Sequence, residues 1–102
     1  MSVFMTLRVK ADPERLQRAI SADTARWQAI NQRAKDNGCV RHRFMQSADG
    51  SEVVVADEWE TSEGFQRFFE ASGEIREIMG EIGVQSEPAI TFWHALETPD
   101  AF

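Results

Sequence analysis

The 102-residue sequence predicts an α+β fold of the ferredoxin-like type, with the element order β-α-β-β-α-β. Residues 2–10 alternate in polarity, an Asp49-Gly50 turn separates two further alternating segments, and two other segments have the period of amphipathic helices. Right-handed crossovers then give a four-stranded antiparallel sheet with two helices on one face. The fold class therefore follows from the order and period of the segments.

The first strand is expected at residues 2–10, because its side chains alternate between an apolar and a mixed face. The apolar face carries Val3, Met5, Leu7 and Val9, and the mixed face carries Phe4, Thr6 and Arg8. Asp12-Pro13 then marks the start of a helix, and Asn37-Gly38 marks its end. We therefore expect one long helix, with an apolar face formed by Leu16, Ile20, Trp27, Ile30 and Ala34.

The second half begins with a hairpin, whose strands are expected at residues 39–46 and 51–59. Thr61 or Ser62 caps a second helix. Ser72-Gly73 is expected to break or kink this helix, because glycine is unfavourable in a helix interior.

Pro88 introduces the last strand, which is expected at residues 89–96. The chain contains neither a linker nor a repeat, so residues 1–98 are expected to form one domain and residues 99–102 a short tail.

The formal net charge of −6 is unevenly distributed. Residues 1–43 carry a net charge of +5 and residues 44–102 a net charge of −11, so we expect the two halves to face one another within one fold. The basic residues are spaced along a strand and a helix rather than clustered with aromatics, so a nucleic-acid partner is not expected.

No apolar run reaches the length of a membrane span, and the first residues lack the pattern of a signal peptide. Cys39 is the only cysteine, which excludes an internal disulfide and a multi-cysteine zinc site. A reducing, cytoplasmic location without membrane association is therefore expected.

The sheet face without helices is expected to form a homodimer interface. Both helices cover the opposite face, whereas this one carries Phe4, Thr6 and Arg8 together with apolar groups from every other strand. Two copies packed face to face would bury these groups and close a barrel-like structure.

Several segments resemble, in order, the antibiotic biosynthesis monooxygenase-like family of dimeric α/β barrels. They are LRVKADPE after the first strand, DNGC at the helix end, the hairpin CVRHRFMQSADGSEVVVADEWE, the Trp59-Glu60-Thr61-Ser62 junction and FFEASGEI in the second helix. The resemblance covers nearly the whole chain. It implies a homodimer with a ligand cavity between the sheet and the helices of each subunit.

The resemblance also implies a function: a cofactor-independent monooxygenase that acts on a small hydrophobic aromatic substrate, polyketide-like or quinol-like. Some family members degrade haem instead, but residues 75–82 of the second helix contain no histidine that could bind its iron. The chain also lacks tyrosine, a common hydrogen-bond donor to a quinone oxygen. We expect no haem, flavin or metal. A non-catalytic dimer that binds a small hydrophobic ligand, or an isomerase or cyclase on the same fold, remains an alternative.

Six residues are candidates for substrate binding. Trp59, Phe65 and Phe68 would form an aromatic wall at the junction of the third strand and second helix, although filling the core is the alternative reading. Thr6 and Arg8 on the mixed strand face and Trp27 on the first helix complete the set.

The catalytic candidates are His42, His94 and Asp23. The two imidazoles are the only side chains whose ordinary pKa lies near neutrality. His42 is expected on a strand face with Val40 and Phe44, and His94 on a face with Phe92; a structural role is the alternative for each. Asp23 interrupts the apolar face of the first helix, where it either marks a frayed edge or needs a buried partner.

Three other sequence features argue against a paired-carboxylate site, a reactive cysteine and a metal site. Asp57 and Glu58 point to opposite strand faces and cannot act as paired carboxylates. Cys39 follows a helix C-terminus, whose dipole disfavours a thiolate, so a structural thiol is expected. No metal-ligand spacing is present.

Overall fold

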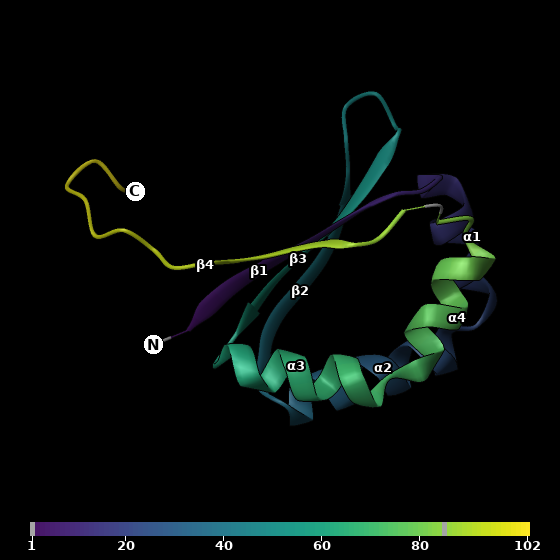
Figure 1. The fold of residues 1–102 in the computed structure, drawn as a ribbon, viewed down its shortest axis with the longest axis horizontal. Coiled ribbons are helices and arrows are strands. Elements are labelled where there is room, and N and C mark those ends of the chain that lie inside the picture. Colours follow the sequence, from purple (N-terminus) through teal and green to yellow (C-terminus); the bar gives the residue numbers. More distant parts are fainter. Residues whose placement is uncertain (1, 85) are drawn as a thin grey trace.

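The computed structural model describes residues 2–84 and 86–102 and confirms the ferredoxin-like α+β fold (Figure 1). The element order is β1 (Val3–Lys10), α1 (Pro13–Ala22), α2 (Thr24–Asp36), β2 (Cys39–Gln46), β3 (Glu52–Trp59), α3 (Ser62–Ala71), α4 (Gly73–Glu81) and β4 (Ala89–Trp93). The strands form one antiparallel sheet in the order β2-β3-β1-β4, and the helices lie on one side of it. β4 ends at Trp93, three residues earlier than predicted.

The first helical region is two helices rather than the single long helix predicted. Asp23 separates α1 from α2, with a backbone φ of −146° that no helix accommodates. Its Oδ1 atom accepts a hydrogen bond of 3.1 Å from the backbone N–H of Arg26, so it is the N-cap of α2. Aspartate at this position satisfies a free N–H of the new helix, which explains why the chain restarts there.

The predicted break in the second helical region is confirmed at Ser72. The Ser72 hydroxyl donates to the backbone carbonyl of Phe68 at 2.6 Å, and α4 begins at the following glycine. Thr61 is the N-cap of α3, where its Oγ1 accepts from the Gly64 N–H at 3.1 Å. The two breaks bend the helical layer so that it follows the twisted sheet (Figure 1).

The core lies between the inner face of the sheet and the helices. The four apolar residues of the inner face of β1 are buried, as the alternation predicts. Trp59 is completely buried at the end of β3, and Met5 is nearly so. The core therefore reaches its greatest depth where the central strands meet α3.

A β-bulge near the start of β2 changes which residues face the helices. Cys39 pairs with Trp59 and Arg41 pairs with Glu58, so the bulge places one extra residue in β2. Cys39 therefore borders the interior with His42 and Phe44, whereas Val40, which the alternation placed on their face, is exposed.

Ion pairs join the basic and acidic parts of the chain, as the charge distribution predicts. Among residues 2–84 and 86–102, every arginine–glutamate pair except Arg18–Glu14 connects the first 43 residues to the remainder. Arg26 lies 3.4 Å from carboxylate oxygens of both Glu77 and Glu81, which joins α2 to α4. These contacts hold the two helical regions together over the core.

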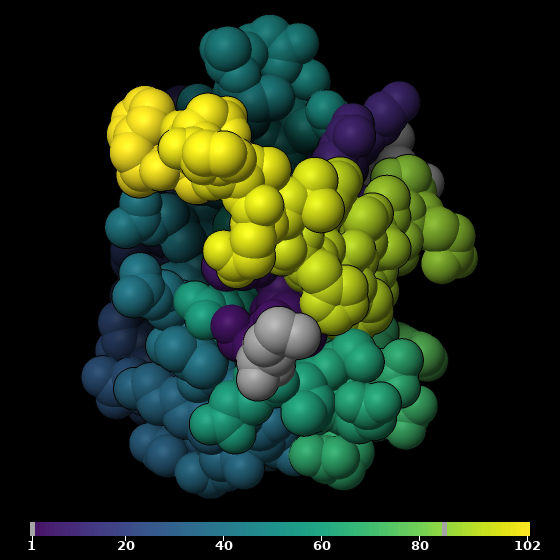
Figure 2. Space-filling model, turned by 90° about the vertical axis from the view of Figure 1, so that its left-hand side faces the viewer, coloured from purple at the N-terminus to yellow at the C-terminus, as the bar shows by residue number. Residues whose placement is uncertain are grey.

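The other sheet face is free of helices, and large apolar side chains are exposed on it. Phe4 is 42% exposed, Met45 46% and Trp93 53%. Residues 94–102 are also exposed, and Figure 2 shows this yellow segment on the side of the molecule away from the helices. Within the described part of the chain, no helix has the length and apolarity needed to cross a membrane.

Candidate functional site

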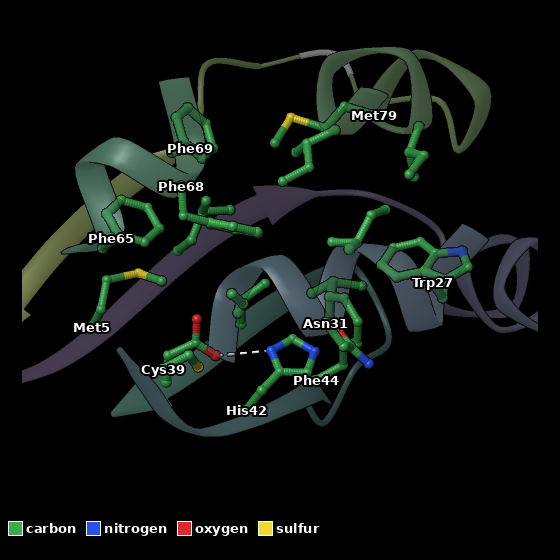
Figure 3. A pocket seen from close by; sticks show the side chains of 18 of the residues that line it. Met5, Trp27, Asn31, Cys39, His42, Phe44, Phe65, Phe68, Phe69 and Met79 are labelled. Atoms are coloured by element: carbon green, nitrogen blue, oxygen red, sulfur yellow. Dashed lines mark hydrogen bonds and ion pairs between the residues drawn. The ribbon is translucent and has the colours of Figure 1, made fainter. Parts of the chain in front are cut away.

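A cavity of about 110 Å³ lies between the inner face of the sheet and the helical layer. Its walls come from β1, β2, β3 and all four helices, and almost every lining side chain is apolar (Figure 3). The polar exceptions are Asn31, His42 and Asp57, with the thiol of Cys39 beside them. The site is therefore an apolar chamber with a few polar groups at one side.

An aromatic cluster closes one end of the cavity. The ring centroids of Phe65 and Phe68 each lie 5.5 Å from that of Trp59, and Phe69 stacks on Phe65 at 5.5 Å. Phe65 and Phe68 share a face of α3, the helix that follows the strand of Trp59. All four rings border the cavity. The cluster expected from the sequence thus forms both core and cavity wall.

The principal polar feature is a chain of three side chains from two neighbouring strands. The His42 Nδ1 atom lies 2.8 Å from Asp57 Oδ1, and the Trp59 indole N–H donates to Asp57 Oδ2 at 3.1 Å. His42 and Asp57 are direct partners in the β2–β3 register. The structure therefore places a histidine–carboxylate pair on the cavity wall.

Asp57 was not a candidate in the sequence analysis, although two signals pointed to it. Its alternation places it on the same face as Val53, Val55 and Trp59, so a buried acid could be expected there. The Asp49-Gly50 turn also pairs Ser47 with Glu52, and counting outwards from that pair sets residue 42 opposite residue 57. The prediction compared Asp57 only with its neighbour Glu58, which does point to the other face.

Two of the residues that line the cavity, His42 and Asn31, are also exposed to solvent. The side chain of His42 is 33% exposed, whereas that of Asp57 is only 7% exposed. Asn31 on α2 also borders the cavity and is exposed. Phe44 also lines the cavity, with its ring centroid 4.8 Å from that of His42 and 5.8 Å from that of Trp27. The imidazole of His42 is therefore in contact with both solvent and the cavity.

The structure brings five of the predicted site residues together and leaves four elsewhere. Trp27, His42, Trp59, Phe65 and Phe68 line the cavity. Thr6 and Arg8 lie on the opposite face of the sheet, where Thr6 accepts from the Trp93 indole at 3.0 Å and Arg8 pairs with Glu52 at 2.9 Å. Asp23 caps α2, and His94 is exposed beyond the end of β4.

Cys39 borders the cavity as a protonated thiol. Burial, together with the negative charge of Asp57, raises its pKa from 9.0 to about 11, although a backbone hydrogen bond from Arg41 and the positive charge of Lys35 oppose the shift. A raised pKa means that folding favours the neutral thiol. The resulting contribution to stability is fully present below pH 9 and is lost as the pH rises through about 11.

We therefore expect Cys39 to resist alkylation at pH 8. A shift of this size lowers the thiolate fraction by roughly 100-fold relative to an unfolded cysteine, and the thiolate is the nucleophile. Iodoacetamide labelling followed by mass spectrometry, on native and urea-unfolded protein, measures the difference. The native rate should rise steeply between pH 9 and 11. Equal alkylation rates in native and unfolded protein at pH 8 would contradict the raised pKa of Cys39.

Within residues 2–84 and 86–102, no three histidine, cysteine, aspartate or glutamate side chains lie together as a group that could hold a metal ion. The absence of haem, flavin and metal from the purified protein stays a prediction.

Solved structures provide the informative comparisons, since neither a protein-family model nor a curated protein sequence matches the chain. A monooxygenase from the gene ActVA-Orf6 of Streptomyces coelicolor, solved with nanaomycin D, is 19% identical with a TM-score of 0.71, covering 95% of this chain and 89% of that one. SnoaB, a cofactor-independent oxygenase from Streptomyces nogalater, is 19% identical with a TM-score of 0.65, and 98% of each chain is covered.

A third similar structure is a dimeric ferredoxin-like protein from an uncultured marine organism. It is 12% identical with a TM-score of 0.64, covering 95% of this chain and 93% of that one. At these identities the similarity establishes the fold rather than the reaction. The chain therefore has the fold of the antibiotic biosynthesis monooxygenases, as the resemblance in its sequence implied.

Proposed function

We propose that the protein is a cofactor-independent monooxygenase that acts on a small, electron-rich phenol bound in the cavity. The observation that carries this proposal is the imidazole of His42, which borders an otherwise apolar cavity and is held by Asp57 at 2.8 Å. Histidine is the commonest general base in proteins, and a phenol becomes reactive toward dioxygen once its hydroxyl proton is removed. The oxygenase activity and aromatic ligand of two similar structures are consistent with this chemistry.

The size of the cavity favours a substrate with a single ring. Its volume of about 110 Å³ is below the roughly 150 Å³ of a protein cavity that holds benzene. A substituted phenol therefore fits with a small outward movement of the helices, whereas a polycyclic polyketide needs a larger one. The ring would lie against Phe65 and Phe68, with the hydroxyl directed toward His42.

The proposed reaction converts a phenol with a free para position and one dioxygen into a para-quinone and one water. His42 accepts the phenolic proton, and the ring carbon of the resulting anion supplies electrons to dioxygen. A carbon–oxygen bond forms at the para carbon, the carbon–hydrogen bond there breaks, and the oxygen–oxygen bond breaks. One oxygen atom stays in the quinone, and the other leaves as water with the two protons. The aromatic cluster excludes bulk water from the cavity during these reaction steps.

A homodimer is part of the proposal. The exposed side chains of Phe4, Met45 and Trp93 lie on the sheet face without helices, and a monomer leaves this apolar surface in water. One of the similar structures is a dimeric protein. The catalytic cavity lies on the opposite side of the sheet, so each subunit would keep its own site.

The proposal predicts dioxygen uptake with methoxyphenols that have a free para position. An oxygen electrode gives the rate, and mass spectrometry after reaction under ¹⁸O₂ should find one labelled oxygen in the quinone. His42→Gln should lower kcat by about 100-fold or more, because general base catalysis contributes that much. His94→Gln is the matched control, since the second histidine is exposed and does not line the cavity. Anthrone, a tricyclic substrate, tests the expected preference for a single ring.

Non-catalytic binding is the second candidate, favoured by the small number of polar groups in the cavity. The same methoxyphenols should then quench tryptophan fluorescence, because Trp27 and Trp59 border the cavity, while dioxygen uptake stays at the background rate. Binding without uptake would overturn the oxygenase proposal in favour of a ligand-binding dimer.

A further inference from the structure

We infer that Asp57 is a positioning residue, which the Trp59 indole holds in place and which fixes His42 in one tautomer. In this tautomer Nδ1 carries the hydrogen and Nε2 is free to accept a proton. The catalytic meaning of this tautomer rests on the proposed function, but the tautomer itself is a property of the resting protein. The observations that carry the inference are the two short contacts of the Asp57 carboxylate and its burial.

The hydrogen-bonding capacities of the three groups determine which imidazole nitrogen carries the hydrogen. An ionised carboxylate only accepts hydrogen bonds, and an indole nitrogen only donates. Asp57 Oδ2 accepts from Trp59 Nε1 at 3.1 Å, and its Oδ1 atom lies 2.8 Å from His42 Nδ1. The second contact is a hydrogen bond only if Nδ1 carries the hydrogen. The carboxylate thus selects the tautomer.

The surroundings of Asp57 hold its carboxylate in one orientation. Trp59 is completely buried, and Phe65 and Phe68 pack on its ring at centroid distances of 5.5 Å. The indole N–H therefore has a fixed direction, and it holds one oxygen of Asp57. The other oxygen meets the neighbouring strand at the position of His42, since residues 42 and 57 are paired in the sheet.

The geometry of the imidazole ring determines where the second nitrogen of His42 lies. Its two nitrogens lie on different sides of the ring, so Nε2 points away from Asp57 (Figure 3). His42 and Asn31 of α2 both line the cavity and are both exposed to solvent. The other titratable group on the cavity wall beside Asp57 is the thiol of Cys39, which is neutral below pH 9. The free nitrogen of His42 is thus available to a ligand that enters here.

Nitrogen NMR of ¹⁵N-histidine-labelled protein tests the inference directly at a pH where His42 is neutral. The chain has two histidines, so His94→Gln assigns the signals. Wild type should show His42 as the Nδ1–H tautomer. In Asp57→Asn, the amide oxygen can accept from Trp59 only if its NH₂ group faces His42 Nδ1. The tautomer should therefore switch to Nε2–H. An Nε2–H tautomer in wild type, or no switch in the variant, would overturn the inference.

Glu58→Gln is the matched control, because Glu58 adjoins Asp57 but points to the other sheet face, where it accepts from the Ser2 hydroxyl at 2.7 Å. It should leave the tautomer unchanged. If Asp57→Asn does not fold, the wild-type spectrum still decides, with exposed His94 as the internal reference.

Activity measurements separate this inference from the proposed function. If methoxyphenol oxygenation occurs, Asp57→Asn should lower kcat by roughly 100-fold with little change in KM, because a base in the wrong tautomer still permits binding. An unchanged kcat in a variant with a switched tautomer would overturn the positioning role. A fixed Nδ1–H tautomer in a wild-type protein without oxygenase activity would overturn the proposed function and leave the tautomer assignment intact.

Discussion

Phe68→Ala is expected to lower the free energy of unfolding by about 3 kcal/mol, near the lower end of the range for a buried phenylalanine. Phe68 is buried and packs on Trp59, but it also borders empty space, so it makes fewer contacts than a fully enclosed ring. Urea unfolding monitored by tryptophan fluorescence measures the loss.

The same substitution should weaken the binding of methoxyphenols by roughly 10-fold, since an aromatic wall contributes about 1.5 kcal/mol to a stacked ring. Phe92→Ala is the matched control: Phe92 packs on Phe65 with ring centroids 5.7 Å apart, but it does not border the cavity. It should cost stability and leave ligand affinity unchanged. Equal affinities in wild type and folded Phe68→Ala would assign Phe68 to the core alone.

The double variant Phe4→Glu/Trp93→Glu is expected to convert the proposed homodimer into a monomer. Phe4 and Trp93 are paired across β1 and β4 on the exposed sheet face. Large aromatic residues at the centre of an interface contribute about 2 kcal/mol or more each, and in a two-fold dimer every substitution occurs twice. The dimer dissociation constant should therefore rise by at least about 1,000-fold.

Light scattering over a range of micromolar concentrations measures this change. Glu97→Gln, in the exposed C-terminal segment, is a control that should leave the assembly intact. A wild-type protein that is a stable, folded monomer at these concentrations would contradict the dimer. If the double variant is still a dimer, the dimer interface lies on another surface.

The sequence was sufficient to predict the fold because its signals are local and agree with one another. The Asp49-Gly50 turn fixes the β2–β3 register, Thr61 starts α3, and Ser72 ends it. Asp23 was harder to interpret, because an aspartate within an apolar stripe is compatible with both a frayed edge and a new helix cap. The choice depends on where the sheet requires the helical layer to turn.

The candidate site was only partly predictable. Spacing along α3 brought Phe65 and Phe68 to the strand end at Trp59, so the aromatic wall followed from local periodicity. Local periodicity could not predict which residues of β2 meet the helices. A bulge shifts Cys39 inwards, and the position of a bulge depends on contacts across the sheet. The cavity itself reflects how closely side chains from seven elements fill a shared volume, which no single segment encodes.

The bulge in β2 also makes this edge of the sheet a poorer template for open-ended assembly. β2 and β4 are the two edges of the sheet, and an unpaired edge can recruit a strand from another copy. The bulge interrupts the regular row of backbone donors and acceptors on β2, where Arg41 and Arg43 add charge. β4 has only five residues and follows Pro88. Neither edge is a good template for fibril growth, so pairing through the broad sheet face can end with two subunits.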